Sequence, residues 1–211
     1  MKKKVLCAVL GAALAACGPA FAQDETKGFY AGVSLGQSKF KGACDSEAGV
    51  AVSNCKDTDT AWKIFGGYQF TPNLAVELGY NDFGRISGDA TLALGGSTFT
   101  GNAKIEATAF ELTGVGTLPL GHQFSLYGKL GVYYAETKAS ANVQQTTPPF
   151  ASGSSSQSDN NSNLTFGLGA RYDFTRNIAV RAEWQRFSKV GSDQTGKGDI
   201  DVLAIGGLYR F

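Results

Sequence analysis

The sequence is poor in several features that would point to common protein classes. Its 211 residues include one methionine and one histidine, and beyond residue 22 no run of 18 apolar residues occurs. The missing run excludes a membrane-spanning helix from that part of the chain. The formal net charge is only +1, without the basic excess that suggests a nucleic-acid partner. A membrane protein that spans the bilayer with helices and a nucleic-acid-binding protein are therefore both disfavoured.

The first residues have the three-part pattern of a secretory signal peptide. Lysines at positions 2–4 precede the apolar run Val5–Ala16, and Ala-Phe-Ala at 20–22 fits signal-peptidase cleavage. The sequence Leu-Ala-Ala-Cys at 14–17 also fits a lipoprotein site, which would make a lipidated Cys17 the new N-terminus. We favour cleavage after Ala22, which gives a signal peptide over 1–22 and one domain over 23–211. Without the three lysines, 16 basic residues face 18 acidic ones, a net charge of −2.

Beyond this segment, apolar and polar residues alternate with period 2, as expected for strands between lipid and a polar lumen. The apolar face of each strand carries no charge, whereas the opposite face carries charges in mid-strand. Every backbone polar group in hydrocarbon needs an internal partner, so such strands must close into a barrel. The sequence predicts an all-β fold, an eight-stranded antiparallel up-and-down transmembrane β-barrel. Its expected strands are Phe29–Gln37, Thr60–Phe70, Asn73–Phe83, Lys104–Leu118, Phe124–Lys138, Leu164–Phe174, Ile178–Phe187 and Ile200–Phe211.

The connections between these strands alternate between short and long, the pattern of outer-membrane barrels with short periplasmic turns and long external loops. Aromatic residues beside the short turns predict a girdle at the membrane interface, formed by Phe70, Phe124, Tyr172 and Phe174. The tight turns are expected at Thr71–Asn73, Pro119–Gln123 and Thr175–Asn177. The long polar loops are expected at Ser38–Asp59, Gly84–Ala103, Ala139–Asn163 and Ser188–Asp199, with a mobile low-complexity stretch at Gln144–Asn163.

Two cysteines remain after the signal region, Cys44 and Cys55. An even pair in an oxidising compartment predicts a disulfide that closes the first long loop. No histidine lies near this pair, and the acidic residues of the loops lack the spacing of a calcium-binding loop. We therefore expect no metal site and no cofactor.

Several charged residues fall on the inward faces of the expected strands. Isolated charges there would each cost several kcal/mol, so they should pair across the lumen. They are expected to form a structural plug, because the interior of eight strands is only wide enough for side chains. The alternative is a gate whose salt bridges exchange partners to admit small ions. The residues of this expected lumen charge network are Lys63, Glu77, Glu111, Lys129, Arg171, Arg181, Glu183 and Arg210.

Three segments carry a family resemblance: 28–36, 66–80 and the closing Leu-x-Ile-x-Gly-x-Tyr-x-Phe at 203–211. Together they resemble the OmpA-type eight-stranded outer-membrane β-barrel family. The resemblance implies a place in the bacterial outer membrane, among its lipid and lipopolysaccharide. It also implies recognition by the barrel-assembly machinery through Leu203, Ile205, Tyr209 and Phe211. Members often carry a second, peptidoglycan-binding domain, and none is expected here because the sequence ends at Phe211.

One motif could indicate chemistry. Gly32–Gly36 matches the Gly-x-Ser-x-Gly pattern of hydrolases, which needs a strand-to-helix elbow and a histidine base. Here the motif lies within an expected strand, and His122 falls in a tight turn at the opposite end of the barrel. We expect no catalytic residues and no enzyme.

These observations predict a structural and surface-display role in the envelope. One alternative is a narrow, low-conductance channel gated by the lumen charges. Another is an adhesin or host-factor binder that acts through the external loops. No nucleic-acid partner is expected.

Overall fold

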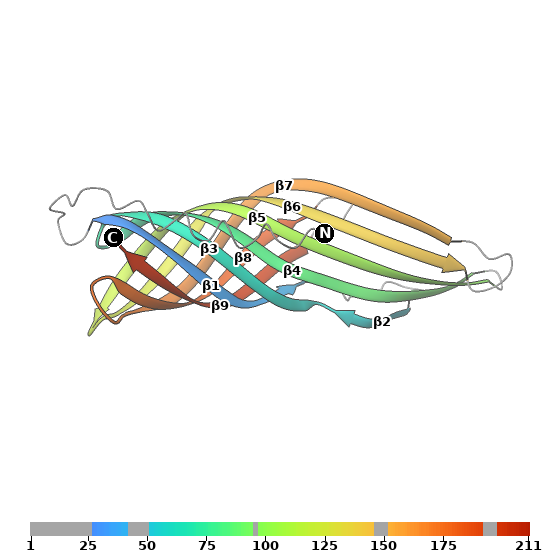
Figure 1. Ribbon diagram of the computed structural model, residues 1–211, viewed down its shortest axis with the longest axis horizontal. Coiled ribbons are helices and arrows are strands. Elements are labelled where there is room, and N and C mark those ends of the chain that lie inside the picture. Colours follow the sequence, from blue (N-terminus) through green and yellow to red (C-terminus); the bar gives the residue numbers. More distant parts are fainter. Residues whose placement is uncertain (1–26, 42–50, 95–96, 146–151, 192–197) are drawn as a thin grey trace, which may run out of the picture.

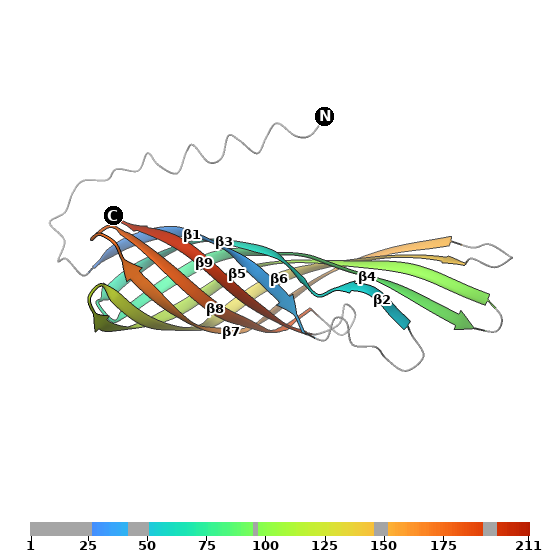
Figure 2. The same cartoon turned by 90° about the horizontal axis from the view of Figure 1, so that it is seen from below.

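The protein is a closed barrel of antiparallel strands with a long extension at one end (Figures 1 and 2). The computed structural model describes residues 27–41, 51–94, 97–145, 152–191 and 198–211. No helix among these residues is long and apolar enough to cross a membrane. The strands are β1 (Gly28–Phe40), β2 (Ala51–Lys56), β3 (Thr58–Thr71), β4 (Leu74–Leu94), β5 (Ser97–Gly121), β6 (Phe124–Gln145), β7 (Ser152–Asp173), β8 (Ile178–Val190) and β9 (Gly198–Arg210).

Each of the eight strands other than β2 pairs with two antiparallel neighbours in the ring, and β4 also pairs with β2, so the predicted eight-stranded barrel is confirmed. The sheet runs β2-β4-β3-β1-β9-β8-β7-β6-β5, and additional pairing between β4 and β5 closes the ring. The first and last strands of the chain meet through eleven aligned pairs, from Tyr30–Arg210 to Phe40–Ile200. Closure leaves no unpaired edge within the ring, which a lipid environment requires.

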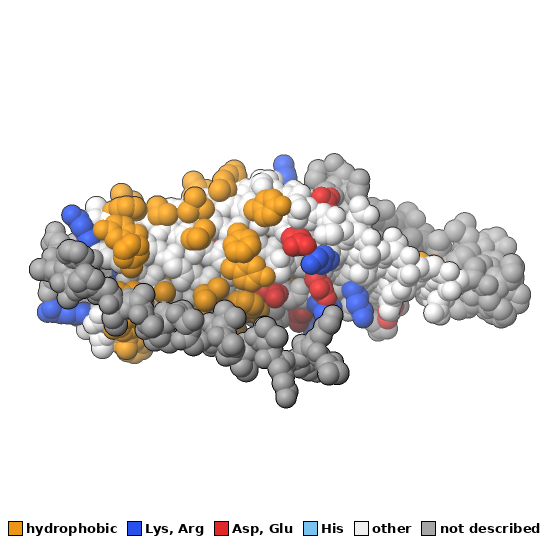
Figure 3. Space-filling model, turned by 45° about the horizontal axis from the view of Figure 1, so that its top comes forward, with side chains coloured by type: hydrophobic (Ala, Val, Ile, Leu, Met, Phe, Trp, Pro, Cys, Tyr) orange, Lys and Arg blue, Asp and Glu red, His pale blue; other side chains and the backbone are white. Residues whose placement is uncertain are grey.

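The outer surface of the ring is an apolar band (Figure 3). Leu35, Leu130 and Leu203 have exposed fractions of 64%, 65% and 66%, which would be unfavourable in water. The predicted girdle beside the short turns is present, and all four of its aromatic side chains are exposed. A second row of outward aromatics borders the far side of the band, formed by Trp62, Tyr80, Phe110, Tyr134, Phe166 and Trp184. Two girdles thus mark the two membrane interfaces.

Two of the three short turns share one hydrogen-bond arrangement. The Thr71 hydroxyl accepts hydrogen bonds from the backbone N–H of Asn73 and Leu74, at 3.3 and 3.0 Å. The Thr175 hydroxyl does the same for Asn177 and Ile178, at 3.2 and 2.9 Å. The β5–β6 turn has positive φ at His122 (50°) and Gln123 (68°), as a two-residue type I′ hairpin requires. All three predicted tight turns are therefore present at this end, which is the periplasmic end by the habit of such barrels.

Two of the four long polar loops expected at the external end, Gly84–Ala103 and Ala139–Asn163, are mostly strand, so the prediction of loops is wrong there. Most of Gly84–Ala103 belongs to β4 and β5, which pair continuously from Arg85–Glu106 to Leu94–Ser97. Most of Ala139–Asn163 belongs to β6 and β7, which pair out to Gln144–Ser152. The stretch expected to be mobile is strand at 144–145 and 152–163, and its residues 146–151 lie outside the described residues. In β7 the backbone ladder sustains residues 152–163 although neither face of this segment is apolar, because the strand continues a hairpin that the membrane region has already aligned.

The extension is a sheet of four long strands, β4 to β7, with β2 added at one side (Figure 1). The short strand β2 pairs with β4 through Ala51–Thr91, Val52–Ala90 and Ser53–Asp89, and lies within the expected first loop. Four strands of the ring therefore project well beyond the apolar band, whereas β1, β3, β8 and β9 end close to it.

Candidate functional site

The middle of the lumen holds a network of buried charges that converges on Glu77 of β4. Lys129 of β6 and Arg181 of β8 both reach this carboxylate, and Arg181 Nη1 lies 2.7 Å from Glu77 Oε2. Tyr30 of β1 donates its hydroxyl to the same oxygen at 3.3 Å. The exposed fraction of the Glu77 side chain is 1%. Period 2 directs all of these side chains inward, and the closed ring brings strands distant in sequence together.

Glu183 of β8 is the second acceptor of the network. Its carboxylate lies 2.7 Å from Lys129 Nζ and 3.4 Å from Lys63 Nζ. The Tyr127 hydroxyl donates to Glu183 Oε2 at 3.0 Å. Lys129 of β6 therefore forms ion pairs with two carboxylates from different strands, Glu77 of β4 and Glu183 of β8.

Glu111 of β5 is the third acceptor. It pairs with Lys63, and its other oxygen accepts hydrogen bonds from Asn81 Nδ2 at 3.1 Å and Gln185 Nε2 at 2.8 Å. Gln185 also accepts from Lys63 Nζ at 3.2 Å and donates to the Thr165 hydroxyl at 2.8 Å. The side-chain amides of Asn81 and Gln185 therefore supply the remaining hydrogen bonds of the Lys63–Glu111 ion pair, at the external side of the network.

Three carboxylates and three cations balance in this central network, formed by Lys63, Glu77, Glu111, Lys129, Arg181 and Glu183. A buried ion pair stabilises a protein only where hydrogen bonds meet its remaining donors and acceptors. Tyrosine and amide groups meet most of them here, whereas the buried Nε–H of Arg181 has no hydrogen-bond partner among the described residues. Arg181 also lies over Phe65, with its guanidinium carbon 3.4 Å from the ring centre.

Small residues make room for the network. A Cβ on Gly79 would lie 3.0 Å from Lys63 Cε and 3.2 Å from Glu111 Cγ. A Cβ on Gly169 would lie 2.4 Å from Cζ of the Tyr127 ring. The Tyr127 ring therefore packs directly over the backbone of Gly169, and it can reach Glu183 in this position only because residue 169 has no side chain.

The lumen is not polar along its whole length, contrary to the sequence prediction. Outward of the central network an apolar plug fills the barrel, formed by Phe40, Phe83, Ile86, Ala107, Ala109, Tyr133, Ala135, Phe187, Val190 and Ile200. Phe83 and Phe187 are fully buried, with ring centres 4.7 Å apart in edge-to-face contact. The reason is the change of surroundings. Near and beyond the second girdle water replaces lipid outside the barrel, so the ordinary rule of an apolar interior returns.

The central network and the apolar plug leave little space between them. A cavity of about 10 Å³ lies between the two, bordered by Asn81, Phe83 and Gln185. A second cavity of about 20 Å³ lies on the periplasmic side of the network, bordered by Tyr30, Glu77 and Arg181. Each has room for about one water molecule.

Two of the eight expected lumen residues are separate from the central network. Arg171 and Arg210 point inward near the periplasmic end, where both contact Asp173, at 3.3 and 2.6 Å. The other six come together in the central network. Sequence reasoning missed Tyr30, Phe65, Asn81, Tyr127 and Gln185, although each lies at an inward position of its strand. Their period-2 placement beside charged residues was the available sign.

Other expected sites have different outcomes. The disulfide predicted between Cys44 and Cys55 stays a prediction. Cys44 lies outside the described residues, and the side chain of Cys55 is not described. Among the described residues no group of three or more His, Cys, Asp or Glu side chains is placed to hold a metal ion. Ser34 of the Gly-x-Ser-x-Gly pattern is buried in mid-strand opposite Lys63, while His122 is exposed in the β5–β6 turn. The structure does not bring these two residues together.

An ion-pair cluster lies at the external rim, beyond the apolar band. Arg186 donates two hydrogen bonds to Asp201, at 2.6 and 2.8 Å, and Lys41 lies 3.2 Å from the same carboxylate. The hydrogen bond from Arg186 holds the pKa of Asp201 below its usual value, although partial burial opposes the shift. Asp201 is thus an ion-pair partner, in keeping with the absence of a calcium-loop pattern around it.

The four expected assembly residues lie on the outer face of β9 or directly after it. The exposed fractions of Leu203, Ile205, Tyr209 and Phe211 are 66%, 64%, 48% and 69%. Their side chains therefore face the surroundings of the barrel and not its lumen.

Solved structures with the same architecture include Neisserial surface protein A and the outer membrane protein OprG from Pseudomonas aeruginosa. The first gives a TM-score of 0.53 at 14% identity, over 87% of this chain and 97% of that one. The second gives a TM-score of 0.50 at 17% identity, over 88% and 96%. Both likenesses concern the fold alone.

Sequence relatives agree with this architecture. Outer membrane protein A of Escherichia fergusonii is 28% identical over 218 residues, covering 100% of this chain and 56% of that protein. Outer membrane protein P5 of Haemophilus influenzae is 30% identical over 193 residues, covering 90% and 52%. The chain thus spans about half the length of the curated relatives it matches. The model of the OmpA-like transmembrane domain matches residues 23–211. The chain belongs to the OmpA-like transmembrane domain family and is a β-barrel protein of the bacterial outer membrane.

Proposed function

We propose that this protein is a structural component of the outer membrane whose lumen is sealed, and that its extended strands form an exposed surface structure. The observation that carries this proposal is the succession of the balanced central network and the apolar plug inside one barrel. An ion would have to break buried pairs and then cross an apolar constriction, which resists wetting.

A liposome flux assay tests the seal. Vesicles that contain the refolded protein should retain a trapped monovalent salt as long as protein-free vesicles do. Refolding is checked by the different gel migration of unheated and heated samples. Rapid release from vesicles with correctly folded protein would contradict the sealed lumen and favour the narrow-channel alternative.

The external extension favours a second candidate, an adhesin or host-factor binder. Strands β4 to β7 project a polar sheet beyond the rim, with exposed Asn102, Asn142 and Ser154. Loss of partner binding when residues 90–101 are removed, with the ring still folded, would support it. Unchanged binding would count against this second candidate and favour the structural role.

The export signal, the cysteine pair and the outward residues of β9 support further proposals. We propose that residues 1–22 are removed on export and that Cys44 and Cys55 form a disulfide. The outward Leu203, Ile205, Tyr209 and Phe211 suit recognition by the barrel-assembly machinery, and the apolar band suits lipid, with lipopolysaccharide beside the external rim. Intact-mass measurement distinguishes cleavage after Ala22 from lipidation at Cys17, and comparison with and without reductant tests the disulfide.

A further inference from the structure

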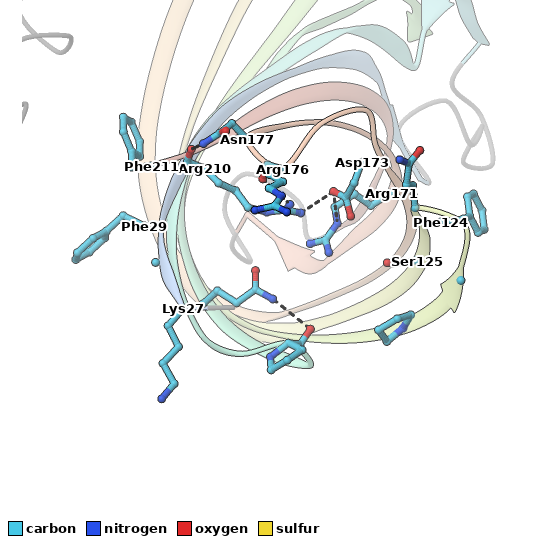
Figure 4. A pocket seen from close by; sticks show the side chains of 16 residues that line it. Lys27, Phe29, Phe124, Ser125, Arg171, Asp173, Arg176, Asn177, Arg210 and Phe211 are labelled. Atoms are coloured by element: carbon cyan, nitrogen blue, oxygen red, sulfur yellow. Dashed lines mark hydrogen bonds and ion pairs between the residues drawn. The ribbon is translucent and has the colours of Figure 1, made fainter. Parts of the chain in front are cut away.

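The periplasmic mouth of the barrel is a basic cavity. Its volume is about 480 Å³, and among the described residues its lining includes the basic side chains of Lys27, Arg171, Arg176 and Arg210 and one acidic side chain, that of Asp173. Figure 4 shows Arg171, Asp173, Arg176 and Arg210 gathered inside the ring, while Phe29, Phe124 and Phe211 point outward. The three arginines and Asp173 thus face the cavity, whereas Lys27 points away from the ring and the three aromatic groups face the membrane interface.

One carboxylate oxygen serves two arginines in this cavity. Asp173 Oδ1 accepts a hydrogen bond from Arg210 Nη2 at 2.6 Å and lies 3.3 Å from Arg171 Nε. The latter contact lacks hydrogen-bond geometry: the buried Nε–H of Arg171 has no hydrogen-bond partner among the described residues. Buried donors are nearly always paired, so this guanidinium is incompletely satisfied by the protein.

The surplus of positive charge at the mouth is local. The central network is balanced, with three cations and three carboxylates, so the mouth arginines are not needed to neutralise it. Arg171 and Arg210 together exceed the charge of Asp173 by one, and Arg176 lies beside them. The cluster of Arg171, Asp173 and Arg210 therefore carries one net positive charge.

The strand register concentrates this charge further. Arg171 lies directly opposite Arg181 in the β7–β8 ladder, an arrangement that is unfavourable for like charges. Arg181 is compensated by Glu77, whereas the ion pair of Arg171 among the described residues is with Asp173, which Arg210 shares. Both Arg171 and Arg210 also border the small cavity beside Glu77 and Arg181.

Arg210 is held in place before any ligand arrives. Arg210 Nη1 donates to the carbonyl of Arg176 at 3.3 Å, while Asn177 Nδ2 donates to the carbonyl of Arg210 at 2.9 Å. The Arg210 backbone N–H also donates to the Asn177 carbonyl at 2.7 Å. The β7–β8 turn and the end of β9 are thus tied together, which lowers the entropy lost on binding.

From this geometry we infer that the periplasmic mouth is an oxyanion-binding site, in which Arg171 and Arg210 bind a phosphate or carboxylate group beside Asp173. Guanidinium groups match such oxyanions with paired N–H donors, and the resulting bonds are charge-assisted. The ligand is a phosphate of the inner-leaflet lipid or a soluble periplasmic oxyanion, which share this chemistry. The site is independent of the sealed lumen, because it lies wholly on the periplasmic side of the central network.

The test uses the refolded full-length barrel with ¹⁵N-labelled arginine in an uncharged glucoside detergent, which contains no phosphate. Inorganic phosphate is titrated at constant ionic strength against chloride, and the Nε–H resonances of arginine are followed by NMR. Those of Arg171 and Arg210 should shift and saturate. The Arg171→Gln and Arg210→Gln variants should each weaken binding by about tenfold or more, since each removes a charge-assisted contact.

Two further variants make the test specific. Asp173→Asn should tighten phosphate binding, because it removes the carboxylate that competes for both arginines. Arg186→Gln removes an arginine from the external rim and should leave binding unchanged. Shifts that do not saturate, or that persist equally in Arg171→Gln protein with a folded backbone spectrum, would overturn the inference.

A second arm distinguishes the two sources of the ligand. The same resonances are recorded in nanodiscs of phosphatidylglycerol without added phosphate. Shifts of Arg171 and Arg210 there identify a lipid phosphate as the occupant, while shifts only on addition of phosphate identify a soluble oxyanion. Absence of specific shifts in both arms would refute the site.

Discussion

The guanidinium carbon of Arg181 lies 3.4 Å from the ring centre of Phe65, on a side chain whose Nη1 is 2.7 Å from Glu77. An aromatic face and a carboxylate thus fix one charge in the middle of the barrel. Arg181 comes from β8, while Glu77 and Phe65 come from β4 and β3. The contact therefore joins opposite arcs of the ring, and it makes the central network a structural element as well as a barrier.

Removal of Arg181 should strongly destabilise the barrel. The Arg181→Gln variant leaves Glu77 short of a buried partner, and the loss in free energy of unfolding should be about 3–5 kcal/mol. Urea unfolding in lipid vesicles measures it. The control is Arg85→Gln, which breaks an exposed pair with Glu106 at the external side and should cost at most about 1 kcal/mol. Equal losses in the two variants would contradict a tightly coupled network.

A methyl group at position 169 should also destabilise the barrel. In the Gly169→Ala variant the new Cβ would lie 2.4 Å from Tyr127 Cζ and 2.6 Å from the carbonyl oxygen of Ala182, so ring and strand must shift. The expected loss is about 1–3 kcal/mol. Gly207→Ala is the matched control, because nothing lies within 4 Å of its Cβ position. If both alanine variants unfold at the same urea concentration, close packing of Tyr127 against this position is not important.

The rim carboxylate Asp201 should contribute a pH-dependent part of the stability. Its pKa in the folded protein is lowered, chiefly by the hydrogen bond from Arg186. The contribution should therefore be complete above the usual aspartate pKa of about 4 and be lost as the pH falls through the lower folded value. The difference in unfolding free energy between the wild type and Asp201→Asn, measured from pH 7 downward, reports this loss. A difference that grew on acidification would have the wrong sign.

The ring should fold without the tip of its extension. Removal of residues 90–101 shortens the β4–β5 hairpin, whose remaining pairs run from Leu74–Gly116 to Asp89–Asn102 with one register shift between Asp82 and Arg85. The heated and unheated samples should still migrate differently on a mild detergent gel. Identical migration of the two would mean that the extension is needed to build the ring.

The sequence was sufficient to predict the membrane part of the fold. Lipid outside and charge inside impose a strict period 2, and positions such as Leu130 and Lys129 fall on opposite faces as expected. The extension could not be predicted in this way. In Ser152–Asn163 neither face is apolar, and pairing with an aligned neighbour is what makes this segment a strand.

The lumen was predictable in composition but not in its division into layers. Inward charges were assigned to one network, whereas Asp173 ties Arg171 and Arg210 into a separate cluster at the mouth. The apolar plug around Phe83 and Phe187 could not be predicted, because the sequence of a single strand does not show where the surroundings of the barrel change from lipid to water. Both features depend on the height of a residue along the barrel axis, which follows from the tilt and stagger of the closed ring.

Single-channel recording in planar bilayers tests the sealed lumen most directly. Wild-type protein and the Arg171→Gln variant should be silent, since Arg171 lies outside the central network. The Glu77→Gln variant should show openings only if the apolar plug also yields, and any openings should be brief. Steady conductance of the wild type, unchanged by Glu77→Gln, would contradict the account, because ions would then pass without meeting the central network.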